Sequence, residues 1–334
     1  MAYEAGLIGE HASIVEVRRL IDRVARSAAR AVLIYGETGT GKGLIARLVH
    51  QQSARAPQPF VDVNCAAIPD QLLESELFGH EKGAFTGAAM RKSGLIETAN
   101  GGSIFLDEIR DMNLVMQAKL LTVLDTQRMR RVGATAAVDV DVRFIAATNR
   151  VLLSEVKAGR FREDLYYRLQ VVAINSPPLR ERGDDIFVLT DNFLRRLSSR
   201  YGRVVRGLSP EARDIFRRYR WPGNVRELEN LLERIFILED DAIILARHLP
   251  DRILRDVREM DGPLNSGAPP QGGAPGIMQV PDEPLDYHEV TAAFQAQVIR
   301  QALVATEGNL TETAARLGLT RHALRHQMLK LGMA

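Results

Sequence analysis

The sequence predicts an α/β protein in which a parallel sheet, covered by helices on both faces, is followed by wholly helical segments. Short continuous apolar runs alternate with amphipathic stretches through the first half of the chain, as they do in buried parallel sheets. A glycine-rich stretch separates the first apolar run from a helical segment. Beyond Pro177 and Pro178 the apolar residues recur only at helical spacing. These observations predict a phosphate-binding sheet subdomain, a small helical lid and a further all-α domain.

Five apolar runs are the predicted strands of this sheet. They cover residues 31–35, 60–64, 103–107, 142–148 and 171–174. A helix over residues 12–27 is predicted to pack beside the first strand. Its apolar residues recur at helical spacing and are Ile14, Val17, Leu20, Ile21 and Val24.

Three helices are predicted after the two prolines. The first covers residues 185–203. The second begins at Ser209, a favourable N-cap residue with Pro210 at the first helical position. The third begins at Asn224, which is predicted to cap the helix with Glu227 as its reciprocal partner.

The chain divides into four predicted parts. Residues 1–178 form the sheet subdomain, 179–255 the helical lid, 256–284 a flexible linker and 285–334 a compact helical domain. The linker prediction rests on frequent prolines and glycines and on a lack of apolar residues to bury.

Composition sets limits on the class of protein. The 334 residues carry a formal net charge of only +2, so any contact with nucleic acid must be local. No long apolar run or export signal is present, which predicts a cytoplasmic protein without membrane spans. The single cysteine, Cys65, excludes an internal disulfide and lies among small apolar residues, as a buried inert thiol would. The seven histidines lack ligand spacing.

The stretch after the first predicted strand is a candidate phosphate loop. Three glycines leave no Cβ to block the backbone, so successive N–H groups can face a polyphosphate while Lys42 supplies a positive charge. The alternative is a glycine-rich turn with an incidental lysine. Gly43 stands where a Ser or Thr hydroxyl usually contacts magnesium, so the metal must be held mainly from elsewhere. The residues of this loop that are predicted to bind the nucleotide are Gly36, Glu37, Thr38, Gly39, Thr40, Gly41, Lys42, Gly43 and Leu44.

Two carboxylates end the third predicted strand, beside the place where the phosphate loop must lie. Asp107 is the predicted Mg²⁺ ligand, and Glu108 is the predicted base that polarises the attacking water. The alternative is an acidic helix cap. Asn149 ends the next strand and is a candidate sensor of the γ-phosphate, although Thr-Asn after a strand is equally typical of a turn.

Arginines follow in the segment Gly159 to Leu169. A solvated face of ion pairs is the usual explanation for such a charge run. The alternative hypothesis is that Arg162 and Arg168 reach the nucleotide of a neighbouring subunit, where they would act in catalysis.

A loop between the second and third strands is not needed for hydrolysis. It has glycines at both shoulders and two substantial side chains, Phe85 and Thr86, so it should be mobile. Phe85 either anchors the loop to the core or is an exposed aromatic that grips a partner protein. The loop residues are Gly83, Ala84, Phe85, Thr86, Gly87 and Ala88.

Over residues 7–255 and 285–332 the sequence resembles the bacterial enhancer-binding activators of sigma-54 RNA polymerase, a branch of the AAA+ ATPases. The intact Gly-Ala-Phe-Thr-Gly-Ala stretch is the most specific element of the resemblance. The other matching stretches are Gly36 to Lys42, Ala99 to Glu108, Phe161 to Arg168 and Trp221 to Leu228.

The resemblance implies roles for these residues. Residues 83–88 would contact sigma-54, and a second loop at about 131–138 would move with them. Asn64 would be a switch that holds the catalytic Glu108, Asn149 would lie in sensor 1, and Arg226 would be the sensor 2 arginine. Members form rings, commonly hexamers, with the active site between subunits. They usually begin with a sensory or receiver domain. Here either that domain has been removed from the sequence, or control of the activator comes from another molecule. Gly43 departs from the glutamate that is usual there.

The C-terminal segment has the layout of a helix-turn-helix, with Gly318 at the turn. It resembles the Fis-like DNA-binding domain of the same family, and the alternative is a helical hairpin used only for dimerisation. The residues predicted to contact DNA are Arg316, Thr320, Arg321, His322, Arg325, His326 and Lys330.

The sequence therefore predicts an ATP-driven activator that binds upstream double-stranded DNA, assembles a ring, dimerises through its C-terminal domain and remodels the closed complex of the sigma-54 RNA polymerase holoenzyme. Two other functions stay open. One is a passive DNA-binding regulator with a degenerate ATPase, and the other is an AAA+ machine that acts on nucleic acid. The intact Lys42 and Glu108 argue against the first, and the intact loop 83–88 argues against the second.

Overall fold

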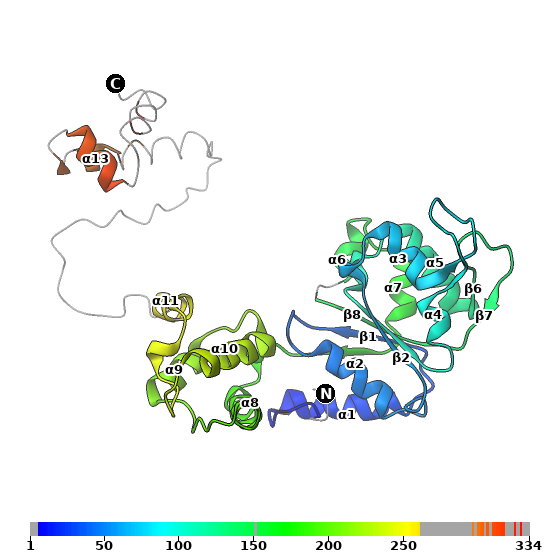
Figure 1. The fold of residues 1–334 in the computed structure, drawn as a ribbon, viewed down its shortest axis with the longest axis horizontal. Coiled ribbons are helices and arrows are strands. Elements are labelled where there is room, and N and C mark those ends of the chain that lie inside the picture. Colours follow the sequence, from blue (N-terminus) through cyan, green and yellow to red (C-terminus); the bar gives the residue numbers. More distant parts are fainter. Residues whose placement is uncertain are drawn as a thin grey trace. The chain divides into compact units, whose positions relative to one another are not determined.

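The computed structural model describes residues 6–149, 152–260, 296, 299–303, 305–306, 309–317, 324 and 328. The chain forms two compact units, Met1–Leu264 and Asn265–Ala334 (Figure 1). The first unit contains a sheet subdomain and a helical lid, and the second contains the C-terminal helices.

The centre of the first unit is a five-stranded parallel sheet with strand order β2-β5-β8-β1-β9. All five predicted strands are present, which confirms the predicted α/β fold class. Two strand boundaries differ from the prediction. Strand β8 begins one residue later than predicted, and β9 does not include Val171, whose side chain is 62% exposed. The strands are β1 (Ala31–Tyr35), β2 (Phe60–Asn64), β5 (Ser103–Asp107), β8 (Arg143–Thr148) and β9 (Ala173–Asn175).

Helices cover both faces of this sheet (Figure 1). Val32 and Ile34 of β1 pack with α1 and α2 on one face, while Leu33 between them faces α3, α5 and α7 on the other. This alternation gives a separate apolar core on each side, as expected for a doubly covered sheet. The helices of this subdomain are α1 (Ala12–Ala25), α2 (Lys42–Gln51), α3 (Asp70–Phe78), α4 (Leu95–Thr98), α5 (Leu114–Thr126), α6 (Leu152–Lys157) and α7 (Glu163–Leu169).

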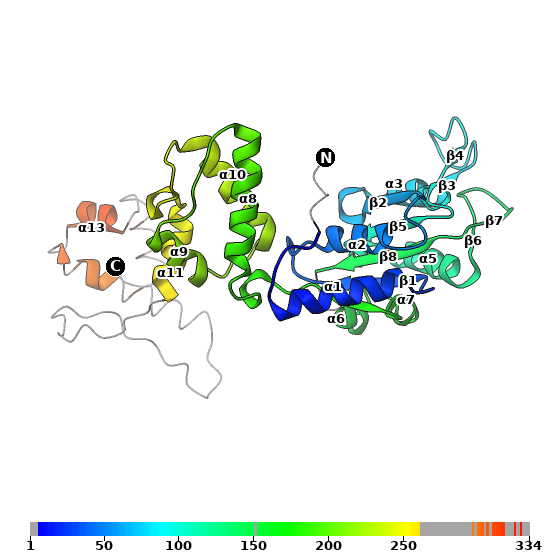
Figure 2. The same cartoon turned by 90° about the horizontal axis from the view of Figure 1, so that it is seen from below.

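Two short antiparallel ribbons extend from the same end of the subdomain (Figure 2). One pairs β3 (Gly79–His80) with β4 (Lys92–Ser93), and the loop 83–88 joins them. The other pairs β6 (Arg128–Met129) with β7 (Val138–Asp139). A bridge between His80 and Val132 links the two ribbons.

The lid has its own apolar core, built around the buried Trp221. Its helices are α8 (Asp185–Tyr201), α9 (Pro210–Arg218), α10 (Asn224–Leu238) and α11 (Asp251–Met260), of which α8 and α10 lie side by side (Figure 2). Helix α8 ends before Gly202, which adopts a left-handed conformation, and not at residue 203. The predicted cap at Ser209 is confirmed, since its side chain accepts the Ala212 N–H. Helix α11 runs into the predicted linker because Val257 is buried in the lid core.

The predicted cap at Asn224 is wrong. Gly223 is the N-cap of α10, and the Glu227 carboxylate accepts the Gly223 N–H at 2.8 Å, as predicted for a reciprocal partner but one residue earlier. The side chain of Asn224 is instead completely buried and turns toward the phosphate loop.

The second unit packs a small apolar cluster around α13 (Leu310–Arg316). Ile299, Ala314 and Leu324 are buried there, and the hydroxyl groups of Thr306 and Thr313 share a hydrogen bond of 2.6 Å. Within the described part of the chain, no helix is long and apolar enough to span a bilayer.

Candidate functional site

The phosphate loop lies between β1 and α2, at the carboxyl edge of the parallel strands. Gly39 and Gly41 have φ values of +80° and +99°, which favour glycine, and Gly41 is the N-cap of α2. A Cβ on Gly36 would lie 2.8 Å from Ser176 and from the Thr40 hydroxyl, so that position also requires glycine. The predicted strand, loop and helix are therefore all present, and the N-terminus of α2 faces the loop.

Lys42 is the first residue of α2, and its side chain is turned back toward the loop. Its ammonium donates to the carbonyl groups of Gly36 and Glu37 at 3.0 and 3.3 Å and lies 3.8 Å from a Glu108 carboxylate oxygen. Burial lowers the pKa of Lys42, and the charges of Glu108 and Asp107 oppose that shift. The ammonium is thus held among groups that a bound phosphate can replace as partners.

Asp107, Glu108 and Asn149 converge beside the loop. Glu108 Oε2 accepts the Asn149 backbone N–H at 3.4 Å, and the Asn149 amide donates to the Thr38 hydroxyl at 3.3 Å. Asn149 Oδ1 is buried without a hydrogen-bond partner among the described residues. Glu108 has φ +50° and ψ +50°, a left-handed conformation that costs a non-glycine residue free energy and is typical of functional sites. The two strand ends therefore deliver an acid pair and an amide to one place.

Asn64 ends β2 and pairs in register with Asp107. Its side chain accepts the Ala66 N–H at 3.0 Å, whereas Glu108 lies against Lys42, Arg110 and the Asn149 N–H. The switch contact between Asn64 and Glu108 that the resemblance implies is thus not made among the described residues, and the role of Asn64 stays a prediction.

Arg162 immediately precedes helix α7 and Arg168 lies within it. Both arginines bind acidic partners within the chain. Arg162 pairs with Asp164 at 2.7 Å, and Arg168 pairs with Asp125 at 2.9 Å. Both guanidinium groups are exposed by more than 40%. In a single protomer they form the ion-paired face that is the usual explanation of such a charge run, and their action on a neighbouring subunit stays a prediction.

Gly43 has room for a larger side chain, because an added Cβ would meet only Phe105, at 3.6 Å. In a G43S variant the free energy of unfolding is expected to rise by about 0.5 kcal/mol, because glycine weakens helices. The same variant should bind ATP more tightly in the presence of magnesium, because the serine hydroxyl can contact the ion. Chemical denaturation and a nucleotide titration measure the two effects. G43A is the matched control, and equal affinities of G43S and G43A would show that position 43 does not reach the metal.

The lid contacts the phosphate loop directly. The backbone N–H groups of Val225 and Arg226 donate to the Gly39 carbonyl at 3.0 and 3.3 Å, and a Cβ on Gly39 would lie 2.2 Å from the Gly223 carbonyl. A cavity of about 680 Å³, lined by Thr38 and by lid residues that include Arg226, opens at this contact. Arg226, the predicted sensor 2 residue, is therefore next to the loop.

Residues outside the predicted set complete this contact. Arg180 forms two hydrogen bonds with the Glu37 carboxylate, and Asn224 donates to Glu37 and to the Thr38 carbonyl. The Trp221 to Leu228 stretch pointed to the Asn224 region, but no local pattern pointed to Arg180.

The loop 83–88 is closed on itself and exposes the side chains of Phe85 and Thr86. The Gly83 N–H donates to the Ala88 carbonyl at 2.8 Å, and both Gly83 and Gly87 have positive φ. Phe85 is 43% exposed, and its ring lies 5.0 Å from that of His80, centre to centre. Thr86 is exposed. Phe85 is thus not an anchor buried in the core.

Arg131 joins this loop to the second one. Its guanidinium, 9% exposed, binds Glu97 at 2.8 Å and Glu81 at 3.1 Å. The Glu81 N–H also donates to the Val132 carbonyl at 3.0 Å, and Gly133 packs closely on Ala84. The two loops are therefore in contact through backbone and side chain.

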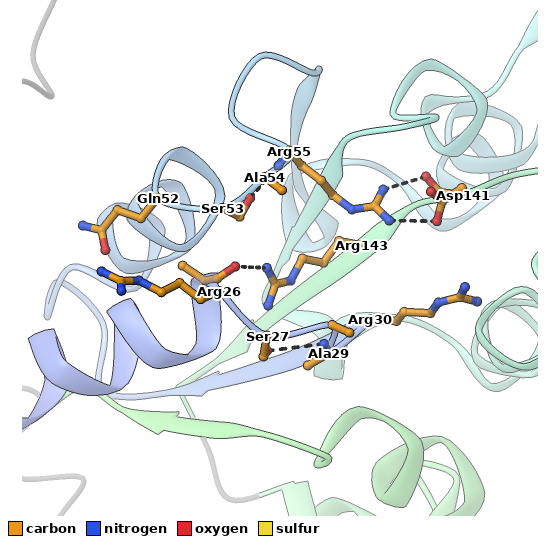
Figure 3. A pocket seen from close by; sticks show the side chains of 12 residues that line it. Arg26, Ser27, Ala29, Arg30, Gln52, Ser53, Ala54, Arg55, Asp141 and Arg143 are labelled. Carbon is orange, nitrogen blue, oxygen red and sulfur yellow. Dashed lines mark hydrogen bonds and ion pairs between the residues drawn. The ribbon is translucent and has the colours of Figure 1, made fainter.

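A second hollow, of about 620 Å³, lies at the opposite, amino-terminal edge of the sheet (Figure 3). Arg143 is buried there and donates to the Ala25 and Val24 carbonyl groups at the end of α1. Arg55 binds the Asp141 carboxylate and three carbonyl groups. These two arginines hold helix and loop ends in place, which is a structural role.

Of the residues predicted to contact DNA, Arg316 is exposed on α13. The others, Thr320, Arg321, His322, Arg325, His326 and Lys330, lie outside the described residues. Cys65 is buried as predicted, and burial raises the pKa of its thiol to about 12. The described residues contain no cluster of potential metal-binding histidine, cysteine and carboxylate side chains.

The parallel sheet, phosphate loop, acid pair and helical lid define the class of AAA+ P-loop ATPases. The chain also matches three protein families: "Sigma-54 interaction domain" over residues 7–175, "AAA+ ATPase lid domain" over 180–263, and "Bacterial regulatory protein, Fis family" over 291–331. The chain belongs to the sigma-54-dependent transcriptional activators. Sigma-54 and DNA are therefore its partners, and the resemblance noted in the sequence is confirmed.

Known proteins similar to the chain agree with this family. It is 46% identical to the response regulator protein PilR of Pseudomonas aeruginosa over 98% of the chain and 70% of PilR. It is 46% identical to the transcriptional regulatory protein ZraR of Salmonella typhimurium over 97% of the chain and 68% of ZraR. The crystal structure of NtrX from Brucella abortus with ADP is 35% identical, with a TM-score of 0.70 over 98% of the chain and 69% of NtrX.

Proposed function

We propose that the chain hydrolyses ATP at the phosphate loop and uses this energy to remodel the closed promoter complex of sigma-54 RNA polymerase. The observation that carries the proposal is the convergence of Lys42, Glu108 and Asn149 beside the loop. The similarity to NtrX, whose structures contain ADP or ATP, supports nucleotide binding.

Each side chain at the loop has a chemical task. The loop N–H groups and Lys42 bind the phosphates, and Glu108 takes a proton from the attacking water. Asp107 would hold Mg²⁺, which would neutralise phosphate charge, and the donor set of carboxylate and amide oxygens suits that ion. Asn149 Oδ1, which has no partner among the described residues, can accept a hydrogen bond from the attacking water, while the amide N–H group of Asn149 can donate to a phosphate oxygen. Asn64 and Arg226 report on the bound nucleotide from the second strand and from the lid.

The rest of the proposal concerns assembly. Subunits form a ring, in which Arg162 and Arg168 leave their acidic partners to complete the neighbouring site, and dimerise through the C-terminal domain. Upstream DNA is bound by residues 316–330 within the domain 285–334, which the linker 256–284 tethers to the sheet subdomain 1–178 and lid 179–255. Tethering several DNA-binding domains to one ring raises affinity for upstream sites.

An ATPase assay titrated in protein concentration tests the shared site. Specific activity is expected to rise with concentration, because Arg162 and Arg168 act only across a subunit contact. Full specific activity at concentrations where the protein is monomeric would exclude a site shared between subunits.

The proposed partner contact uses the loop 83–88, whose exposed Phe85 and Thr86 suit a protein surface. We infer that hydrolysis at Glu108 moves this loop through α3, because α3 runs directly into β3 of the ribbon that carries the loop.

An R131A variant is expected to hydrolyse ATP but to lose at least about tenfold in activation of a sigma-54 promoter. The change leaves the carboxylates of Glu81 and Glu97 without their shared cation, so the two loops no longer hold one arrangement. ATPase and transcription assays on one preparation measure the effect. R128A, which removes a more exposed arginine of the same ribbon, is the control, and unchanged activation by R131A would show that the loops act independently.

A further inference from the structure

The tip of the phosphate loop is tied to the lid by an ion pair that lies outside the catalytic residues. Two guanidinium nitrogens of Arg180 donate to the two Glu37 carboxylate oxygens at 2.7 and 2.8 Å. This bidentate geometry is the most favourable one for an arginine and a carboxylate. The hydrogen bonds from Arg180 also lower the pKa of Glu37, because they stabilise its ionised form.

The ion pair continues into a buried hydrogen-bond network. Asn224 donates to Glu37 at 3.2 Å and to the Thr38 carbonyl at 3.0 Å, and it accepts the Leu179 N–H at 2.8 Å. Asn224 therefore connects the loop with the backbone next to Arg180. Asn224 and Trp221 of the same turn have φ values of +51° and +52°, a strained conformation for non-glycine residues, and this turn carries the Asn224 side chain that binds the loop.

The position of Arg180 makes the ion pair sensitive to lid movement. Arg180 lies in the short 3-10 helix Leu179–Glu181, between the last strand β9 and the first lid helix α8. Its other acidic neighbour, Glu181, is 3.6 Å away and moves with it. A rotation of the lid that carries the 3-10 helix Leu179–Glu181 with it would therefore separate Arg180 from Glu37.

The charge of Glu37 gives the ion pair a second consequence. A free carboxylate at the tip of a phosphate loop would repel a polyphosphate, and Arg180 neutralises it. Separation of the pair would thus both release the lid and expose a negative charge beside the bound nucleotide. Both effects favour departure of the nucleotide.

We propose that Arg180 is a positioning residue of the nucleotide site that holds the lid on the phosphate loop through Glu37 and thereby slows the release of ADP. This inference rests on the proposed nucleotide binding. The side chains of Arg180 and Glu37 are both about 40% exposed, so the pair contributes little to the free energy of folding. Its effect is on the equilibrium between a lid held on the loop and a lid released from it.

The test measures dissociation of a fluorescent ADP analogue by stopped flow in the full-length chain. R180A is expected to release the analogue about fivefold faster than the wild type and to raise KM for ATP, with thermal stability unchanged. R180K keeps the charge but not the bidentate geometry, so it should recover only part of the difference. E37Q should speed release less than R180A does, because it frees the lid without leaving an unpaired negative charge beside the nucleotide. The E37Q/R180A double variant should release the analogue no faster than R180A, because the two residues act through one contact. R196A, which breaks an exposed ion pair with Glu229 far along the lid, is the control.

Two results would overturn the inference. One is a release rate of R180A equal to that of the wild type. The other is a double variant whose effect is the product of the two single effects, which would mean that Arg180 and Glu37 act independently. Failure of the wild type itself to bind the analogue would instead contradict the proposed function. The two failures are thus distinguishable in one experiment.

Discussion

Replacing Glu108 with glutamine is expected to reduce ATP turnover by about 100- to 10,000-fold while ATP and ADP still bind. The amide of glutamine cannot accept the proton of the attacking water, but it fills the same space beside Lys42 and can still accept the Asn149 N–H. K42A, in contrast, removes the charge that binds the phosphates, so it should lose nucleotide binding as well as turnover. Steady-state phosphate release and a nucleotide titration separate the two variants.

E16Q is the matched control for the glutamate substitution. Glu16 is an exposed carboxylate on α1 that pairs with Arg19, so its replacement should leave turnover unchanged. If E108Q retained more than about one tenth of wild-type turnover, Glu108 would not be the base. The contacts with Lys42 and Arg110 would then be explained as an ion-paired cluster that stabilises the end of β5.

The sheet and the catalytic edge were predictable because their determinants are local. A buried strand followed by Asp107 and Glu108 places both carboxylates at the carboxyl edge of a parallel sheet, whatever the rest of the chain does. The same is true of Gly41 and Lys42, whose backbone geometry follows from neighbouring residues. The sequence resemblance added the roles of loops that physical reasoning alone left ambiguous, such as Phe85.

The contacts that the sequence did not predict join distant segments. Glu37 and Arg180 are 143 positions apart, so no periodicity or spacing connects them. Asn224 was expected to cap its own helix because Asn favours that position. Its side chain binds Leu179 and Thr38 instead, since the lid is packed against the loop and Gly223 can serve as the cap. Tertiary contacts thus decided between two local options.

Arg162 and Arg168 show a different limit. Their exposed ion pairs with Asp164 and Asp125 satisfy both guanidinium groups in one protomer. Exposed pairs of this kind contribute at most about 1 kcal/mol, so a neighbouring polyphosphate can compete for either arginine. Geometry within one chain therefore neither requires nor opposes their role across a subunit contact.

Replacing Thr86 with alanine is expected to leave ATP hydrolysis intact and to reduce sigma-54-dependent transcription by about 30- to 700-fold, the range of a residue central to a protein interface. Thr86 is exposed at the tip of a loop that is closed by the hydrogen bond between Gly83 and Ala88, so its loss should not disturb the fold. ATPase activity and transcription from a sigma-54 promoter, measured on the same preparation, give the two readouts.

M90A is the matched control, because Met90 follows the same loop and is 77% exposed but lies outside residues 83–88. It should activate transcription like the wild type. Full activation by T86A would show that the loop does not carry the contact with sigma-54, whatever the state of the ATPase. Loss of hydrolysis in T86A would instead mean that the loop acts on the nucleotide site. Only separate effects on hydrolysis and activation support a loop that passes the energy of ATP to another protein.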